Sequence, residues 1–186
     1  ELDALAHIDL KTKEIKAIGR TLNIVRIGTS GSVQADIPVD SFVISEKSIG
    51  CDGVLRFYAN NESVCDHPFE EAFIRHCRWT PSAARPYVVN ADPGLVDRLY
   101  DEEHTIKGVT LTAVGFYGPQ GRVLRLPLAM PGINDRITAF RYEGYKVTNY
   151  EMESAAITGL CNLLGHRAAT ICLIIANRIN GDASAD

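Results

Sequence analysis

One segment, residues 151–176, constrains the fold more than any other part of the sequence. Apolar residues recur from Met152 to Leu164 at the spacing of one helix face, and Gly165 follows as a typical helix stop. Residues 168–176 then read Ala-Ala-Thr-Ile-Cys-Leu-Ile-Ile-Ala, an almost uninterrupted apolar run of strand length. A strand without polar alternation is covered on both faces, as in sheets that carry helices on each side. The segment therefore predicts a helix over residues 151–164 that leads into a buried strand.

The rest of the chain alternates between strand and helix patterns. Asp92 and Pro93 form a typical helix start, because aspartate can cap the first turn and proline fits the first helical position. Further strands are predicted over residues 22–27, 41–45, 86–90 and 108–116, and further helices over residues 1–10, 92–103 and 134–143. Residues 60–85 are irregular, and either a surface excursion or a short extra helix over residues 70–77 is expected there. This alternation predicts an α/β fold with a largely covered sheet, in one domain over residues 1–186.

The composition is that of an ordinary globular protein and argues against two classes of partner. Of the 186 residues, 46% are apolar and 23% are charged, and the formal net charge is -4. A protein that binds the nucleic-acid backbone normally carries a basic surplus, so no nucleic-acid partner is expected. No apolar run approaches the roughly 20 residues that a membrane-spanning helix needs, so no membrane partner is expected either.

The cysteines and histidines give no sign of a metal centre. Cys51, Cys65, Cys77, Cys161 and Cys172 are odd in number and contain no pair at CxxC spacing. Buried free thiols in a reducing cytosol are predicted, rather than disulfides or metal ligands. The five histidines are scattered, with no pair at helical spacing. We therefore predict no bound metal and a cytoplasmic location.

Both ends of the chain read as cut. Glu1 lies inside an apolar helix pattern with no initiating methionine before it, and the polar residues 181–186 are followed by nothing. We expect the chain to be an interior piece of a longer protein, truncated at both ends, and the domain to be incomplete.

The first candidate for chemistry is residues 26–32, which read Arg-Ile-Gly-Thr-Ser-Gly-Ser at the end of a predicted strand. Glycines let a backbone turn so that successive N–H groups point at one anion. Thr29 and Ser30 add hydroxyl donors, and Arg26 adds a charged fork. The segment predicts a phosphate or sulfate site, and a plain strand-end turn is the alternative. It is not a P-loop, because no Gly-Lys-Ser/Thr follows.

The second candidate is residues 116–122, which read Phe-Tyr-Gly-Pro-Gln-Gly-Arg and also follow a predicted strand. A planar base can lie on an aromatic ring such as that of Phe116. Gln120 can both donate to a carbonyl and accept from an N–H, which suits the O=C–N–H edge of uracil. Arg122 can stabilise negative charge as the base departs. The alternative is a polar hairpin tip beside a core phenylalanine.

The third candidate lies at the start of the helix predicted over residues 151–164. Glu151 and Glu153 flank Met152, which heads the apolar face. A carboxylate at the edge of a pocket can accept two hydrogen bonds from a vicinal diol, such as ribose O2′ and O3′, and the thioether offers an apolar wall for the sugar. The alternative needs no ligand, since the helix dipole alone favours acids in the first turn.

The fourth candidate is Asn177 with Arg178, directly after the last buried strand. Ligands commonly bind at the carboxyl ends of strands in α/β sheets, so the position indicates a ligand contact. A solvent-facing arginine at a strand end is the alternative.

Together the four clusters resemble one family, the nucleoside phosphorylases of the trimeric and hexameric type, and within it the uridine phosphorylases. The resemblance runs from Glu1 to about Asp182, and its specific parts are residues 25–31, 52–53, 116–122, 149–155 and 177–178. It implies one domain in which a mixed central β-sheet is flanked by helices in three layers. The purine enzymes of this family carry an aspartate at the last site to protonate the base, and here Arg178 stands instead.

The resemblance also implies a reaction, an assembly and a role for each residue. Phosphate would attack C1′ of uridine as the glycosidic bond loosens, giving uracil and ribose 1-phosphate. Inorganic phosphate is then the co-substrate, and no cofactor or covalent nucleophile is needed. The implied assembly is a homo-oligomer of dimers, a hexamer. The implied ligands are Arg26 and Thr29 for phosphate, Glu151, Met152 and Glu153 for ribose, and Phe116, Gln120, Arg122 and Arg178 for uracil.

Two departures from the family pattern bear on activity. Gly121 stands where the family usually has a glutamate, which bears on how firmly Arg122 is oriented. The family's amino-terminal part, with a glycine-rich phosphate loop, more arginines and a histidine donated by the neighbouring subunit, does not precede Glu1. This piece alone is therefore expected to be inactive. Two other functions stay open: a phosphorylase for thymidine or a purine nucleoside, and a non-catalytic relative that binds nucleosides or only builds an oligomer.

Overall fold

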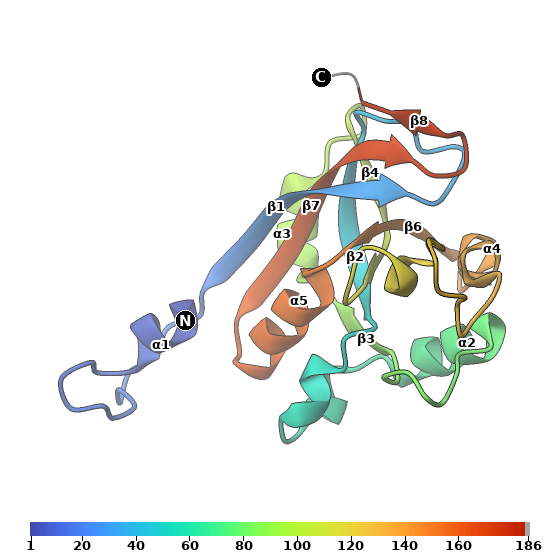
Figure 1. Cartoon of the computed structure of the whole chain (residues 1–186). Helices are drawn as coiled ribbons and strands as arrows, with labels where there is room; N and C mark the ends of the chain where they lie inside the picture. Colours follow the sequence, from blue (N-terminus) through green and yellow to red (C-terminus); the bar gives the residue numbers. More distant parts are fainter. Residues whose placement is uncertain (185–186) are drawn as a thin grey trace.

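The computed structural model describes residues 1–184 and contains one mixed sheet with helices on both of its sides (Figure 1). In chain order the elements are α1 (Leu2–His7), β1 (Asn23–Ser32), β2 (Phe42–Gly50), η1 (Val54–Phe57), η2 (Asn61–Val64), α2 (His67–Cys77), β3 (Tyr87–Asn90), α3 (Pro93–Leu99), β4 (Thr105–Thr112), η3 (Gly118–Gln120), α4 (Ile133–Ala139), β5 (Arg141–Tyr142), β6 (Tyr145–Glu151), α5 (Ser154–Leu163), β7 (Arg167–Asn177) and β8 (Asp182–Ala183). The predicted α/β class is confirmed.

The sheet closes on itself through β2. This strand pairs in parallel with β4 and antiparallel with β7, so the path β2–β4–β6–β1–β7 returns to its first strand. The pairs β4–β6 and β1–β7 are parallel, whereas β1–β6 is antiparallel. β3 and β8 extend the sheet beyond this ring, and β5 forms a hairpin with β6. The prediction of a mixed central sheet is therefore confirmed.

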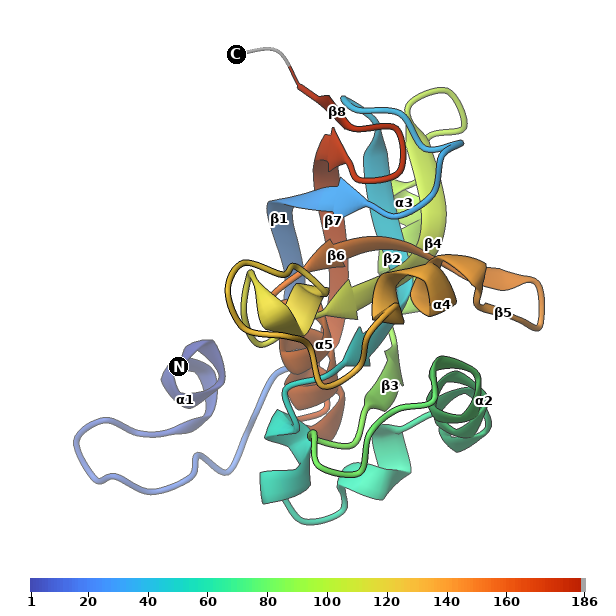
Figure 2. The ribbon, with the colours of Figure 1, turned by 45° about the vertical axis from the view of Figure 1, so that its right-hand side comes forward.

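Two helices cover opposite sides of the sheet (Figure 2). α3 packs Leu95 against Ala169 of β7 on one side. α5 contacts β2, β4 and β7 from the other side. A Cβ on Gly159 would lie 2.5 Å from the side chain of Leu55, so a glycine inside this helix permits the close approach of η1.

An aromatic cluster joins α2 and α4 beneath β4 and β6. Phe140 meets Phe69 and Phe73 edge to face, with ring centroids 5.4 and 5.3 Å apart. Such pairs contribute about 0.5–1.5 kcal/mol each beyond the area that they bury. The cluster holds α4 in place, and α4 carries Asn134, which contacts the loop after β4.

Several predicted boundaries are wrong, and strand pairing explains the largest error. The helix predicted over residues 151–164 begins three residues later, because Glu151 pairs with Thr112 as the last residue of β6. The strand predicted over residues 22–27 continues to Ser32, because β7 pairs with it along its whole length. The helix that starts at Asp92 is confirmed, but it ends at Leu99.

The helix predicted over residues 134–143 ends at Ala139, and the chain turns into a hairpin there. Glu143 and Gly144 both have positive φ, at 48° and 81°, in the two-residue connection between β5 and β6. Two positive φ values match the right-handed twist of paired strands, which favours glycine and other permissive residues in such turns. Gly144 is therefore a hairpin residue and not the predicted helix stop.

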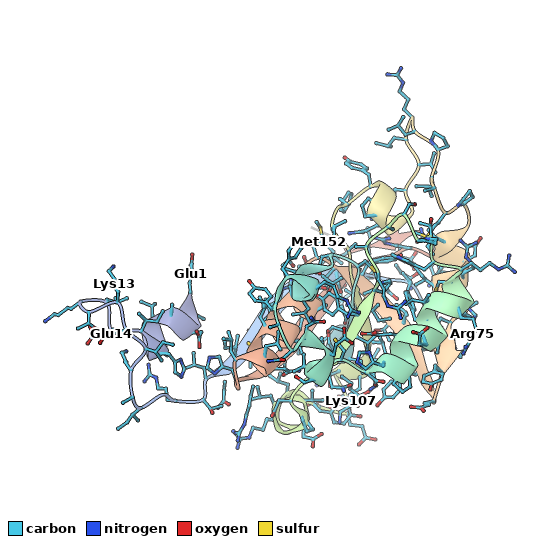
Figure 3. The ribbon with its side chains drawn as sticks, turned by 90° about the horizontal axis from the view of Figure 1, so that it is seen from below. Glu1, Lys13, Glu14, Arg75, Lys107 and Met152 are labelled. Carbon is cyan, nitrogen blue, oxygen red and sulfur yellow. The ribbon has the colours of Figure 1, made fainter. Side chains whose placement is uncertain are left out.

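Residues 1–22 project away from the sheet, and Glu1, Lys13 and Glu14 lie well apart from the body of the chain (Figure 3). Large apolar side chains on this segment are exposed, including Leu5, Ile15 and Ile18. The face of β1 that follows is also open, with Ile27 79% exposed. In the part of the chain that the structure describes, none of the helices has the length and apolar character needed to cross a bilayer.

Candidate functional site

A cavity of about 370 Å³ lies where β1, β6 and β7 meet the loop that follows β4. This volume is within the range of pockets that bind small molecules. All nine residues predicted from the sequence line it: Arg26, Thr29, Phe116, Gln120, Arg122, Glu151, Met152, Glu153 and Arg178. The fold therefore brings together four clusters that are far apart in the sequence.

β1 forms one end of the cavity, and the geometry of residues 26–32 differs from the anion-binding turn that was predicted. Residues 26–32 continue the strand, so successive N–H groups point to opposite edges and cannot converge on one anion. Gly28 does not turn the chain. It shares a strand face with Arg26, and a Cβ at Gly28 would lie 2.5 Å from the guanidinium. The glycine thus leaves space for the Arg26 head group, and the predicted anion-binding turn is wrong.

The guanidinium of Arg26 contacts three groups from other strands and turns. Its Nη2 donates to Glu153 in a short ion pair, and its Nη1 lies 3.4 Å from Glu151 Oε2. Nη1 also donates to Cys172 Sγ at 3.2 Å. Burial acts to lower the pKa of Arg26, but the negative charge of Glu151 and then of its other neighbours outweighs burial, and the pKa is raised. Thr29 follows on the same strand and lines the cavity with an exposed side chain.

Glu151 is a buried carboxylate with partners on both oxygens. Thr112 Oγ1 donates to Oε1 at 2.5 Å, and the backbone N–H groups of Glu153 and Ser154 donate to Oε2 at 2.8 and 2.7 Å. These two N–H groups belong to the first turn of α5 and would otherwise be unsatisfied. Burial outweighs the hydrogen bonds and raises the pKa of Glu151. Glu151 therefore fixes the start of α5 and the position of Arg26.

Glu153 and Met152 are the more open members of the same cluster. The Glu153 side chain is 52% exposed, and Met152 is 40% exposed at the cavity wall. Glu151 has a structural role that needs no ligand, because it ends β6 and accepts from the backbone N–H groups at the start of α5. Glu153 keeps a carboxylate that can turn towards a ligand.

The other end of the cavity is organised around Gln120, which is only 3% exposed. Arg122 Nη1 donates to its Oε1 at 2.6 Å, and Arg178 Nη2 donates to the same oxygen in a short contact. The oxygen of the amide is thereby occupied, and the amide NH₂ group can donate to a ligand carbonyl. The guanidinium carbon of Arg122 lies 3.9 Å from the centroid of the Phe116 ring, and Nη1 also donates to Phe116 O at 2.5 Å.

Two arginines in one partly buried place create a strongly positive end. Burial, followed by the charge of Arg122, lowers the pKa of Arg178 to about 10. Burial also lowers the pKa of Arg122. Within residues 1–184 no acceptor reaches the buried Nε of Arg178. Its guanidinium lies 4.5 Å from the ring centroid of Tyr150. This end can accept an anionic or carbonyl-rich planar group.

The structure explains why position 121 holds a glycine, where the family pattern usually has a glutamate. Its φ is +69°, and a Cβ would lie 2.4 Å from the amide of Asn134, which donates to Gln120 O at 3.1 Å. Phe116 and Gln120 hold Arg122 in the absence of an acid at position 121.

Several residues of the site were not predicted. Tyr150 directly precedes Glu151, and this position could have indicated a role for it; its hydroxyl donates to Asn134 Oδ1 at 3.1 Å. Thr112 and Cys172 sit in apolar strands and carry no pattern of their own. Asn177 does not line the cavity: its amide donates to Ile37 O at 2.8 Å and thereby fixes the turn that presents Arg178.

A second, larger cavity of about 1160 Å³ shares Arg122 and Tyr150 with the first. Apolar side chains form most of its wall, including Trp79 and Leu128. Because the convergent charges and hydrogen-bonding groups line the smaller cavity, the smaller one is the candidate site.

One cluster in the described part of the chain has the composition of a metal site. Ligand atoms of Asp3, His7 and His166 lie within 4.8 Å of one another. His7 Nε2 accepts from Arg20 N and His166 Nδ1 accepts from Leu22 N, so the other nitrogen of each ring is protonated and faces Asp3. A metal would need these protonation states reversed. The cluster fits a hydrogen-bonded tether that ties residues 1–22 to the body.

All five cysteines are free, as predicted, and all except the half-buried Cys65 are buried. Burial raises the pKa of each of the five thiols. None of the thiols therefore combines the low pKa and exposure of a reactive nucleophile.

The chain belongs to the phosphorylase superfamily, whose sequence pattern matches residues 11–186. Over 176 residues it is 26% identical to a uridine phosphorylase of Thermococcus kodakarensis, covering 91% of this chain and 53% of that protein. It is 36% identical over 160 residues to uridine phosphorylase A of Schistosoma mansoni, covering 85% and 49%.

The fold has a counterpart among solved structures. A crystal structure of Trypanosoma brucei nucleoside phosphorylase, a protein described as showing uridine phosphorylase activity, superposes with a TM-score of 0.81. It is 22% identical in sequence and is matched over 100% of this chain and 68% of that chain, which supports the fold. The chain spans about half the length of the curated relatives that it matches.

Proposed function

We propose that the protein that carries this chain cleaves uridine with inorganic phosphate to give uracil and ribose 1-phosphate, in pyrimidine nucleoside salvage. One observation carries the proposal. A single cavity has an arginine beside two carboxylates at one end, and a glutamine between two arginines at the other. The first end suits an anion and a sugar diol, and the second suits the carbonyl edge of a pyrimidine.

The proposed placement follows the lining residues. Arg26 and Thr29 hold phosphate, and Glu153 accepts from the ribose hydroxyls beside Met152, with Glu151 in support from behind. The uracil-binding residues are Phe116, Gln120, Arg122 and Arg178. No cofactor takes part.

The proposed chemistry is a displacement at C1′. A phosphate oxygen bonds to C1′ while the C1′–N1 bond breaks, and the electron pair moves onto uracil, which then takes a proton. Arg122 and Arg178 stabilise the negative charge that spreads to the uracil carbonyls. The protein positions two substrates and balances charge, and no covalent intermediate is formed.

Phosphorolysis rates on uridine, thymidine and inosine test this proposal. We expect phosphate-dependent release of uracil from uridine and a higher kcat/KM than for inosine, because Arg178 cannot protonate a departing purine. A clear preference for inosine would contradict the assigned role of Arg178, and binding of uridine without turnover would favour the non-catalytic alternative.

We also propose that residues 1–186 form one nucleoside phosphorylase-like domain that assembles as a homo-oligomer of dimers, a hexamer, in the cytoplasm. Exposed apolar side chains on residues 1–22 and on β1 support an assembly, because contiguous apolar surface favours association. The free thiols support a reducing compartment. Light scattering after size exclusion measures the mass of the assembly, and a monomer at micromolar concentration would contradict it.

A further inference from the structure

Arg26, the residue proposed to bind phosphate, already has a partner in this structure. Arg26 Nη2 forms an ion pair with Glu153, the residue proposed to hold the ribose. The residue proposed to bind phosphate is therefore paired with the residue proposed to bind ribose, and neither is free for its substrate. A phosphate anion that approaches Arg26 would also meet two carboxylates, those of Glu151 and Glu153, next to the one guanidinium.

The two carboxylates differ in how easily they can move. Glu151 is buried and held by Thr112 and two backbone N–H groups, so it stays beside Arg26 Nη1. Glu153 is half exposed, and in the described part of the chain Arg26 is the one hydrogen-bonding partner of its carboxylate. The Nη2 edge of Arg26 can therefore change partner while Nη1 keeps its place.

We infer that the Arg26–Glu153 pair blocks the site to both substrates, and that phosphate and nucleoside each release the residue that the other one needs. Phosphate takes Arg26 Nη2 and releases Glu153, which can then accept from the two ribose hydroxyls. A nucleoside that takes Glu153 likewise frees Arg26 for phosphate. This inference rests on the proposed function. It predicts positive coupling between the two substrates, which linkage requires to be equal in both directions.

The size of the coupling follows from the stability of the pair. Let K be the ratio of the form with the Arg26–Glu153 pair to the form without it. Each ligand alone then binds more weakly by a factor of 1 + K, because it must first break the pair. Once the first ligand is bound, this factor no longer applies to the second ligand. Exposed ion pairs are worth little, and this one has a half-exposed partner, so K is about 2 to 10. Saturating phosphate should therefore tighten uridine binding about 3- to 10-fold.

The test is calorimetric titration of the protein that carries this chain. Uridine is titrated without and with saturating phosphate at low temperature, within the time before turnover, and inorganic phosphate is titrated alone. Glu153→Gln removes the charge that blocks Arg26, so phosphate alone should bind about 3- to 10-fold tighter than to the wild type. Glu71→Gln is the matched control, because it removes a carboxylate from an exposed ion pair with Arg85.

Three outcomes separate this inference from the proposed function. Coupling in the wild type that disappears in Glu153→Gln supports it. Uridine and phosphate that bind independently, with phosphate affinity unchanged by Glu153→Gln, overturn it and leave the proposed function standing. A protein that binds no uridine in either condition overturns both.

Discussion

Replacing Glu153 with alanine tests the ribose end of the site without disturbing the fold. The Glu153 side chain is 52% exposed, and Arg26 keeps its contact with Glu151 when the pair with Glu153 is lost, so the free energy of unfolding should change by no more than about 1 kcal/mol. A hydrogen bond to a charged group contributes about 1.5–3 kcal/mol. Two such bonds to O2′ and O3′, partly replaced by water in the variant, should cost about 3–4 kcal/mol in the transition state.

The assay is phosphorolysis of uridine at saturating phosphate. A loss of 3–4 kcal/mol lowers kcat/KM by roughly 10²- to 10³-fold. Because Glu153 would contact O2′, the loss in kcat/KM should be about tenfold smaller with 2′-deoxyuridine. The cycle formed by the two proteins and the two nucleosides isolates the free energy of this one contact. Glu71→Ala serves as the control for an exposed glutamate. An unchanged kcat/KM for uridine, or an equal loss for both nucleosides, would refute the assigned contact.

Three further substitutions have expected outcomes. Gly28→Ala places a Cβ 2.5 Å from the Arg26 guanidinium, so the KM for phosphate should rise about tenfold with little change in Tm; an unchanged KM would count against Arg26 as the phosphate ligand. Gly121→Glu puts a side chain at φ +69° and 2.4 Å from Asn134, so it should cost about 1–3 kcal/mol in urea unfolding, and a stabilised protein would contradict the loop geometry. The pKa of Glu151 is raised above its ordinary 4.5 in the folded protein, so this residue's contribution to stability falls as pH rises from 4.5 through the folded pKa. Glu151→Gln should remove that part of the slope of unfolding free energy against pH, and an identical slope would refute it.

Local patterns predicted much of the fold, and long-range pairing decided the rest. The Asp92–Pro93 helix start and the apolar strand before Asn177 were predictable because their signals lie within a few residues. The assignment of Glu151 to a strand depends on Thr112, 39 residues earlier, and helix periodicity carries no trace of that partner. The hairpin at Glu143 was missed because a glycine at position 144 serves a helix end and a hairpin equally well.

For the site, too, one part could be predicted from the sequence and another could not. The residue types, taken together with the resemblance to the nucleoside phosphorylases, predicted which side chains line the cavity. Contacts among them could not be predicted: Arg26 and Glu153 are 127 residues apart, and their ion pair depends on the close approach of β1 to the end of β6. Gly28 shows why the sequence alone was not enough. A glycine suits a tight turn, and it equally suits a strand position that leaves space for a neighbouring arginine side chain. The pairing of β1 decides between the two.

The position of a bound nucleoside would show directly whether the smaller cavity is the substrate site. A crystal structure of the protein with uridine and sulfate, which replaces phosphate without supporting turnover, would locate base and sugar. We predict the uracil against Phe116 with its carbonyls facing Gln120 and Arg178, the ribose hydroxyls on Glu153 and the sulfate on Arg26. Uridine in the larger apolar cavity beside Trp79, or sulfate away from Arg26, would contradict the account.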